Sequence, residues 1–454
     1  MRTAWLYLLA PALLAVTTAT AQPPHYQLKE CCELCPLAAV PEAYRSPSLR
    51  AFTVLHQGED GWLFRSRDLR ERAGPNEAAY LQLTRLATAL KSRGTQLLIV
   101  YPPSRGLMHS DKLRGAASAG FDLDLARHSY SITLRRLRAA GILVPRLEAL
   151  SEDGFEDYYL RRGLAWTPAG ARITAEKVAA TLREQPALAD WPRQKLTAEA
   201  AGMRGERGKL ADVAKQLCGV GNWPRQYVPE YLIAQPASDG GAPAITLVGN
   251  EFSAGQSPFP VFLAAALGVT VANHSVARRG IEAAMHSYLR SPEFQRNPPR
   301  FLIWQLASFH ELSDLSFFRE LLPLATDACA QEPALLSQTL ALQPGRNEAL
   351  FNGDGQVRRL RARDLQIELR FSEPITQPFK LQLWFTNGQH YEASFHYSRT
   401  VDTRGRYALA LRDDEEFADL TFLSADIQMP SSLPAGISAR AELCPRPQIS
   451  PYVY

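Results

Sequence analysis

The sequence predicts an α/β domain, with a mostly parallel sheet covered by helices on both faces, followed by an antiparallel β-sandwich. Two features of the chain lead to this prediction. Between about residues 75 and 310, segments with helical spacing alternate with short apolar runs, which is typical of a parallel sheet with helical crossovers. From about residue 336 onward, short strands follow one another with turn residues between them, which is typical of a sandwich.

The first 21 residues have the pattern of a secretory signal peptide. Arg2 supplies a positive charge, residues 4–16 are nearly all apolar, and Ala19-Thr20-Ala21 has the small residues of a cleavage site. A buried core helix is the alternative interpretation. No later segment has the roughly 18 consecutive apolar residues that a membrane-spanning helix needs. We therefore expect a mature chain that begins at Gln22, is exported to a bacterial periplasm and has no transmembrane segment.

The α/β domain is predicted from three helices and five short strands. The helices cover residues 77–93, 123–140 and 168–182, and Thr167 is predicted to cap the third because Pro168 suits a first helical position. The buried strands cover residues 96–101, 142–145, 244–248, 269–272 and 301–306. The carboxyl ends of such strands form one edge of the sheet, where ligands bind.

The sandwich is predicted from a run of strands with turn signals between them. The strand at residues 379–385 ends at Asn387-Gly388, a strong hairpin turn. Further strands are expected at residues 391–397, 406–411 and 420–428, and a loop at 430–436. The chain is thus divided into a signal peptide (1–21), an α/β domain (22–335) and a β-sandwich (336–446).

The composition excludes two classes of protein. Hydrophobic residues make up 46% and charged residues 21% of the chain, which excludes an intrinsically disordered protein. The 50 basic residues nearly balance the 46 acidic ones, for a formal net charge of +4. Because a dedicated nucleic-acid-binding protein concentrates basic charge, we expect no nucleic-acid partner.

All six cysteines follow the expected cleavage site, which indicates disulfides in an oxidising compartment. Their spacing alone does not choose among the possible pairings. The Cys31-Cys32-x-x-Cys35 cluster is open to a second interpretation as a redox or metal site. No second cluster completes a zinc site, so we expect neither a metal nor a cofactor.

The turn after residues 244–248 is the first place to look for chemistry, because it lies at the carboxyl edge of the predicted sheet. It reads Val248-Gly249-Asn250-Glu251-Phe252-Ser253. Hydrolases of this architecture often place a nucleophilic serine shortly after such a glycine, where backbone N–H groups can form an oxyanion hole. Here Glu251 occupies that place, and Ser253 is two residues further on.

Several segments in the same order give the chain a resemblance to a known family. They are residues 60–65 (DGWLFR), 101–107 (YPPSRGL), 166–172 (WTPAGAR), 297–300 (NPPR), 345–348 (GRNE) and 401–403 (VDT). On these segments the chain resembles the AlgX family of periplasmic alginate O-acetyltransferases. The resemblance implies an SGNH-hydrolase-like domain followed by a carbohydrate-binding module, and alginate as the polymer.

The resemblance also shows which catalytic residues are missing. The family's Asp-x-His pair falls on Gly163 and Ala165, and its nucleophilic serine falls on Glu251. Without an imidazole there is no general base near neutral pH, and without a serine there is no acyl-enzyme, so we expect the family's chemistry to be lost. Ser253 with His274 is the best substitute pair, although a lone histidine in such a place is more often structural.

Four residues are candidates for binding a polyuronate. Arg278 and Arg279 fall on a stretch that lines the family's site, and guanidinium groups pair well with carboxylates; solvated surface arginines are the alternative. Lys380 and Trp384 have even spacing on one strand and match family positions thought to contact polymer. The alternative for Trp384 is a place in the core.

The resemblance implies two disulfides, Cys35 with Cys218 and Cys329 with Cys444, and leaves Cys31 and Cys32 without an assignment.

Three functional hypotheses follow. The first is a periplasmic protein of alginate biosynthesis, modification and export that binds alginate or a related polyuronate without acetylating it. The second is an active O-acetyltransferase with a non-standard site. The third is a structural adaptor that binds other periplasmic export or acetylation proteins.

Overall fold

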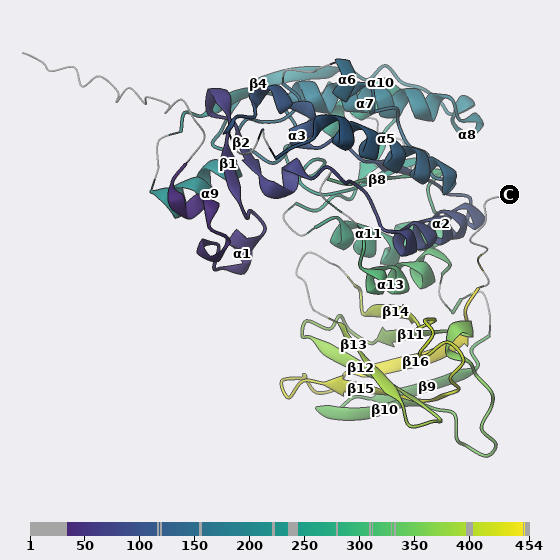
Figure 1. Ribbon diagram of the computed structural model, residues 1–454. Coiled ribbons are helices and arrows are strands. Elements are labelled where there is room, and N and C mark those ends of the chain that lie inside the picture. The colour runs from purple at the N-terminus through teal and green to yellow at the C-terminus, as the bar shows by residue number, and fades with distance from the viewer. Residues whose placement is uncertain are drawn as a thin grey trace, which may run out of the picture.

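A four-stranded parallel sheet forms the centre of the larger domain in the computed structural model (Figure 1). The structure describes residues 34–115, 118, 120–153, 157–219, 223–234, 244–277, 280–307, 310, 312–327, 329–330, 333–395, 403–447 and 449. The expected signal peptide, Cys31, Cys32, Arg278 and Arg279 lie outside these residues. The sheet has the order β3 (Gln96–Val100), β8 (Phe301–Gln305), β6 (Ile245–Val248), β7 (Val271–Asn273). Every neighbouring pair is parallel, as the sequence predicts.

The three predicted helices are present. They are α2 (Glu77–Ser92), α5 (Leu123–Ala139) and α7 (Pro168–Arg183), and Thr167 caps α7 by accepting a hydrogen bond from the Gly170 N–H at 3.1 Å. The other α-helices among the described residues of the domain are α1 (Pro47–Arg50), α3 (Arg105–Met108), α6 (Leu150–Asp153), α8 (Pro186–Ala189), α9 (Lys209–Cys218), α10 (Phe259–Leu267), α11 (Gly280–Arg290), α12 (Pro292–Arg296) and α13 (Leu315–Ala325). Helices α7 and α10 pack together on one side of the sheet, and α2, α11 and α13 lie on the side that faces the sandwich (Figure 1).

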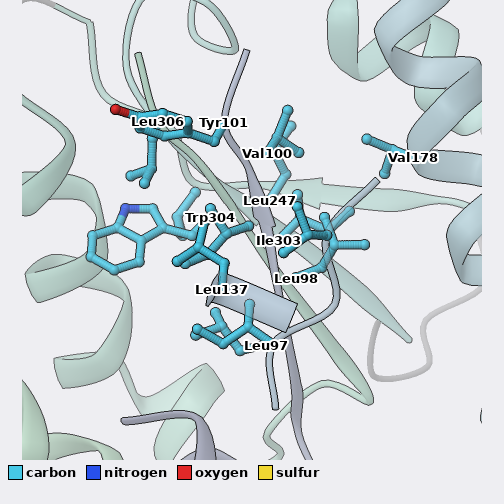
Figure 2. Packing of buried hydrophobic residues seen from close by; sticks show 14 of the residues in the cluster. Leu97, Leu98, Val100, Tyr101, Leu137, Val178, Leu247, Ile303, Trp304 and Leu306 are labelled. Carbon is cyan, nitrogen blue, oxygen red and sulfur yellow. The ribbon is translucent and has the colours of Figure 1, made fainter. Parts of the chain in front are cut away.

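The centre of the core is made by the sheet itself. Leu97, Leu98, Leu247, Ile303 and Trp304 are buried and meet side chains from the helices on either side of the sheet, such as Leu137 of α5 and Val178 of α7 (Figure 2). Because strands β3, β6 and β8 are buried on both faces, their sequences are continuous apolar runs.

Two predicted strands need correction. Residues 142–145 form a single parallel bridge, in which Leu143 exchanges two hydrogen bonds of 2.9 Å with the backbone of β3. The strand stops there because Pro145 has no N–H to continue the ladder. The strand predicted over residues 269–272 begins later, at Val271, although Val269 is buried.

An antiparallel hairpin that was not predicted stands apart from the central sheet. It pairs β4 (Ala198–Glu206) with β5 (Gln226–Ile233), and helix α9 lies between the two strands in the chain. A further two-stranded sheet pairs β1 (Leu55–Gln57) with β2 (Leu63–Arg65). Strand β5 runs alongside helix α7.

The C-terminal domain is an antiparallel sandwich of two four-stranded sheets. One has the order β10 (Gly345–Phe351), β15 (Phe422–Met429), β12 (Phe379–Phe385), β13 (His390–Phe395). The other has the order β14 (Arg406–Ala410), β11 (Leu365–Phe371), β16 (Ser438–Pro445), β9 (Leu336–Ala341). The predicted strand at 420–428 therefore lies at 422–429, and the one at 391–397 is described only as far as Phe395.

An ion pair and a disulfide join the two domains. Arg85 of α2 and Arg446 both pair with Asp413, at 3.3 and 3.0 Å. Disulfides link Cys35 to Cys218 and Cys329 to Cys444, as the family resemblance implies. None of the helices in the described ranges is long and apolar enough to cross a membrane.

Candidate functional site

The turn after β6 is built around Asn250 and Gln305. A side chain at Gly249 would place its Cβ atom 2.7 Å from Gln305 Oε1, so a larger residue there would displace Gln305. Asn250 is buried, and its Oδ1 accepts a hydrogen bond from the Phe252 N–H at 3.1 Å while its carbonyl accepts from Ser253 and Ala254. This network holds Glu251 in the turn as a half-buried side chain.

The structure does not bring Ser253 and His274 together as a catalytic pair. Ser253 is completely buried, and its hydroxyl donates to Gln305 Oε1 at 3.1 Å. The exposed ring of His274 packs against Tyr288 with 4.9 Å between ring centroids. Desolvation lowers the pKa of His274, and the nearby charge of Glu293 opposes that effect. A hydroxyl with no exposed surface is poorly placed to attack a polymer.

A turn between Tyr159 and Trp166 carries the other two family positions. A β-bridge joins these two residues, and the Leu160 N–H donates to the carbonyl of Ala165 at 3.1 Å, so Gly163 and Ala165 lie in the turn. Trp166 packs edge-on against Phe252, with ring centroids 5.0 Å apart. Because these residues directly follow Ala165 and Glu251, the fold brings together the positions that the family resemblance predicts for the base and the nucleophile.

Arg105 stabilises this turn by hydrogen bonds to its backbone. Its guanidinium, in a side chain that is only 3% exposed, donates to the carbonyl of Leu160 at 2.9 Å and to the carbonyl of Gly163. Burial lowers the pKa of Arg105 to about 10, which leaves it protonated at neutral pH. A Cβ atom on Gly163 would lie 2.9 Å from the Leu160 side chain, so an aspartate does not fit there without movement.

His109, which also contacts Tyr159, has a structural role. Its Nε2 accepts a hydrogen bond from the Tyr159 N–H at 3.2 Å, and its ring lies against Trp62 with centroids 4.0 Å apart. Burial, followed by the charges of Arg105 and Lys112, lowers its pKa to about 2. His109 is therefore neutral at physiological pH and occupied as an acceptor.

Arg162, at the outer side of the turn, ties several segments together. Its guanidinium donates to the carbonyl of Pro224 at 2.6 Å and to that of Gly61 at 3.4 Å. Its own carbonyl accepts from the Leu210 N–H at 2.9 Å, at the start of helix α9. Gly208 makes this possible, because a Cβ atom there would lie 2.3 Å from the Arg162 oxygen. Arg162 therefore acts as a structural crosslink.

On the sandwich, Lys380 and Trp384 share the outward face of strand β12, while Leu381 and Leu383 point into the core. The register of the four strands arranges this face in three rows. One row carries Arg346, Gln428, Lys380 and Ser394; the next Glu348, Asp426, Gln382 and Glu392; the third Phe351, Ser424, Trp384 and His390. The face thus has a cationic, an acidic and an aromatic row.

Neighbouring side chains already engage both candidate residues on this face. Lys380 pairs with Glu392 at 2.7 Å, and Arg346 pairs with the buried Asp426 at 2.9 Å. The indole of Trp384 donates to Asp426 at 3.1 Å and stacks on His390 with centroids 4.3 Å apart. Trp384 is half-buried and lies outside the core, with part of its ring available to a ligand.

Comparison with known proteins assigns the chain to a family. Residues 55–308 match the family described as the SGNH hydrolase-like domain of acetyltransferase AlgX, and residues 328–452 match a C-terminal carbohydrate-binding module. The alginate biosynthesis protein AlgX of Pseudomonas aeruginosa is 35% identical over 446 residues, which cover 96% of this chain and 93% of that protein. The chain belongs to the AlgX family.

Other members and a solved structure agree with this assignment. AlgX of Azotobacter vinelandii is 35% identical over 93% of this chain and 90% of that protein. A solved structure of Pseudomonas aeruginosa AlgX superposes with a TM-score of 0.84, at 34% identity over 91% of this chain and 99% of that one. A more distant relative, the probable alginate O-acetylase AlgJ of Pseudomonas aeruginosa, is 24% identical over 66% of this chain and 80% of that protein.

In this AlgX-family chain, the two turns that carry the predicted site positions are in contact through Trp166 and Phe252. Sequence reasoning identified positions 163, 165 and 251 through the family alone, and it did not foresee the supporting roles of Arg105 and Arg162. Val276 is bonded to the turn after β6, since its N–H donates to the Gly249 carbonyl at 2.9 Å, and Arg278 and Arg279 fall outside the described residues. Within the described part of the chain, no group of three or more His, Cys, Asp and Glu residues is arranged to hold a metal ion.

Proposed function

We propose that this protein is a periplasmic component of alginate biosynthesis that binds alginate or a related polyuronate and has lost acetyl transfer at the family's site. The observation that carries the proposal is that no aspartate, histidine or serine stands at the positions where the family resemblance expects the acid, the base and the nucleophile. Gly163, Ala165 and Glu251 sit at those positions, and the packing of Trp166 against Phe252 holds the two segments together.

The surroundings of the turn argue against an improvised replacement. Ser253 is buried against Gln305, and His109 is buried as a neutral acceptor. Glu251 could in principle attack an ester, but it would form an anhydride, which is short-lived in water. An active O-acetyltransferase with a non-standard site is therefore the weaker alternative.

Polymer binding is supported by the outward face of the β10-β15-β12-β13 sheet. Trp384 offers an aromatic surface for a sugar ring, and Lys380 lies two cross-strand rows away on the same strand. Lys380 can exchange Glu392 for a uronate carboxylate because both side chains are about half exposed, so the pair is weak in water. Binding of other export or acetylation proteins, as an adaptor, is the remaining alternative.

The proposal is tested by two measurements on the mature protein. The first follows hydrolysis of a chromogenic acetyl ester together with the intact mass of the protein, which detects an acetyl-enzyme. We expect no turnover above that of the Glu251→Gln variant and no acetylated protein. Turnover that disappears in Glu251→Gln would show that the turn still performs chemistry.

The second measurement is affinity electrophoresis in gels that contain polymannuronate. We expect retardation of the wild-type protein, and weaker retardation of Lys380→Ala and Trp384→Ala. Leu340→Ala, on the other sheet, is a suitable control for nonspecific destabilisation, since it only packs against the core. Migration that polymannuronate does not change would favour the adaptor.

A further inference from the structure

Two cavities adjoin on the α/β domain, between strand β5 on one side and the Tyr159–Trp166 turn and helix α7 on the other. Their volumes are about 510 and 480 Å³. Asp157 and Gln226 line both cavities, which together form what we call the hairpin groove. Each volume falls in the range of about 300–1,000 Å³ that small-ligand pockets usually have.

One half of the hairpin groove is rich in arginine. Arg161, Arg162 and Arg225 line it with Trp223 and two carboxylates, Asp157 and Asp60, and Asp60 is paired with Lys112 at 3.4 Å. Arg162 is committed to the backbone carbonyls of Gly61 and Pro224, and its guanidinium lies 5.5 Å from the centre of the Trp223 ring. Arg161 and Arg225 are exposed, and neither has a carboxylate within ion-pair distance among the residues that the structure describes. Both guanidinium groups are therefore available to an anionic ligand.

The other half of the groove is aromatic. Tyr227 and Tyr231 line it, and the side chain of Tyr227 is 65% exposed, which is unusual for a large ring. Arg172 of α7 lies over Tyr231, 5.3 Å from the ring centre, and fixes that ring against the helix. Gly205, opposite Tyr227 in the hairpin, leaves room for the Arg225 and Tyr227 side chains, since a Cβ atom there would lie 3.1 Å from each.

Two polar side chains, Gln226 and Asp157, lie where the two halves of the groove meet. Gln226 Oε1 accepts a hydrogen bond from the Arg161 N–H at 3.0 Å, so its amide nitrogen remains to donate. The exposed carboxylate of Asp157 is an acceptor for hydroxyl groups. A ligand that fits must offer an anion, a flat apolar face and several hydroxyls, and an acidic sugar offers all three.

We propose that the hairpin groove is a second saccharide-binding site, which takes an acidic oligosaccharide by pairing its carboxylates with Arg161 and Arg225 and stacking a sugar ring on Tyr227. This inference rests on the proposed binding of a polyuronate and adds a site to it. We expect the carboxylates of the ligand to bind in the groove, because the cations of the sandwich face, Arg346 and Lys380, are each paired with a carboxylate of the protein. The sandwich face and the groove then bind separate parts of one chain.

The test is isothermal titration of the mature protein with a polymannuronate hexasaccharide and, as a neutral probe, with cellohexaose. The first variant is Arg161→Gln with Arg225→Gln; both side chains are exposed, so folding is preserved. The matched control is Arg135→Gln with Arg296→Gln, which removes two exposed arginines of the same domain outside the groove. Tyr227→Ala and Tyr227→Trp test the stacking.

We expect the groove variant to bind the hexasaccharide at least about tenfold more weakly, as the loss of two charge-assisted contacts implies, and the control to change less than about twofold. Tyr227→Ala should weaken binding and Tyr227→Trp should retain it, and cellohexaose should bind poorly to every variant. Unchanged affinity in the groove variant, with a loss in the Lys380→Ala/Trp384→Ala double variant, would overturn this inference and leave the proposed function standing. A wild-type protein that binds no polyuronate would overturn both.

Discussion

Replacement of Gly208 by alanine tests the crosslink that Arg162 makes beneath the Tyr159–Trp166 turn. Gly208 precedes helix α9 with φ +89° and ψ 131°, a conformation that is nearly restricted to glycine. A Cβ atom there would lie 2.3 Å from the Arg162 oxygen, the atom that accepts the Leu210 N–H. The variant must therefore strain the backbone and lose that hydrogen bond.

The expected cost can be worked from these two effects. Backbone strain of this kind costs about 1–3 kcal/mol, and the lost hydrogen bond costs about 1 kcal/mol more. We add about 1 kcal/mol for the displacement of packed backbone, which gives about 3–5 kcal/mol in the free energy of unfolding. Gly219, at the other end of the same helix, has φ +68° and nothing within 4 Å of its Cβ position. Gly219→Ala should therefore cost only about 1–2 kcal/mol.

The assay is urea unfolding followed by tryptophan fluorescence, with the midpoint and slope fitted for each variant. Trp223 is a useful reporter because Arg162 lies over its ring. Equal losses of stability in the two variants would refute the reasoning, since both carry a positive φ and only one meets a backbone atom. A smaller loss for Gly208→Ala would refute it more strongly.

Three further outcomes are expected. The pKa of His109 is lowered to about 2 in the folded protein, whereas a histidine in the unfolded chain takes up a proton near pH 6.5. The free energy of unfolding should therefore fall as the pH drops below about 6. His109→Gln should reduce this pH dependence in acid unfolding curves, and an unchanged pH dependence would assign it to other groups. The Cys329→Ser/Cys444→Ser variant removes a disulfide that spans 115 residues, so its free energy of unfolding should be lower by about 2–5 kcal/mol. Differential scanning calorimetry would detect this as a lower Tm, and an unchanged thermogram would contradict it. Ser253→Ala removes the hydrogen bond to Gln305, so its free energy of unfolding in urea should be lower by about 1 kcal/mol. The variant should leave ester turnover unchanged, and reduced turnover would identify Ser253 as a nucleophile.

The fold was predictable where buried strands give continuous apolar runs in the sequence. Strands β3, β6 and β8 are buried on both faces and appear as continuous apolar runs, so the parallel sheet was predicted correctly. The β4–β5 hairpin was missed because β4 reads AEAAGMRGE, with small and polar residues and no alternation. Its pairing depends on β5 and on helices α7 and α10, which local sequence does not reveal.

The family resemblance predicts positions for the site but not the side chains that support them. The family resemblance predicts residues 163, 165 and 251 as site positions. The structure places Gly163 and Ala165 in the Tyr159–Trp166 turn and Glu251 in the turn after β6, and the contact of Trp166 with Phe252 joins the two turns. Arg105 and Arg162 were not foreseen, because a buried arginine that serves backbone carbonyls looks like any surface arginine in the sequence. The same limit applies to Arg161 and Arg225, whose proximity depends on the bond between Gln226 and the Arg161 backbone.

The disulfides illustrate a third case. The cysteine count indicated an oxidising compartment, but only the resemblance to a family implied which cysteines pair. The structure confirms both pairs, and the Cys35–Cys218 bond anchors the end of helix α9 close to Trp223. Cys35, Cys218 and Trp223 pack against the same cluster of buried residues, so this disulfide lies near one end of the hairpin groove.

The most direct test of the account is native mass spectrometry of the mature protein incubated with polymannuronate oligosaccharides and a soluble acetyl donor. The account predicts a stable complex between protein and oligosaccharide, in which neither partner gains an acetyl group. Acetylated oligosaccharide formed by the wild-type protein would contradict the loss of chemistry at Gly163, Ala165 and Glu251.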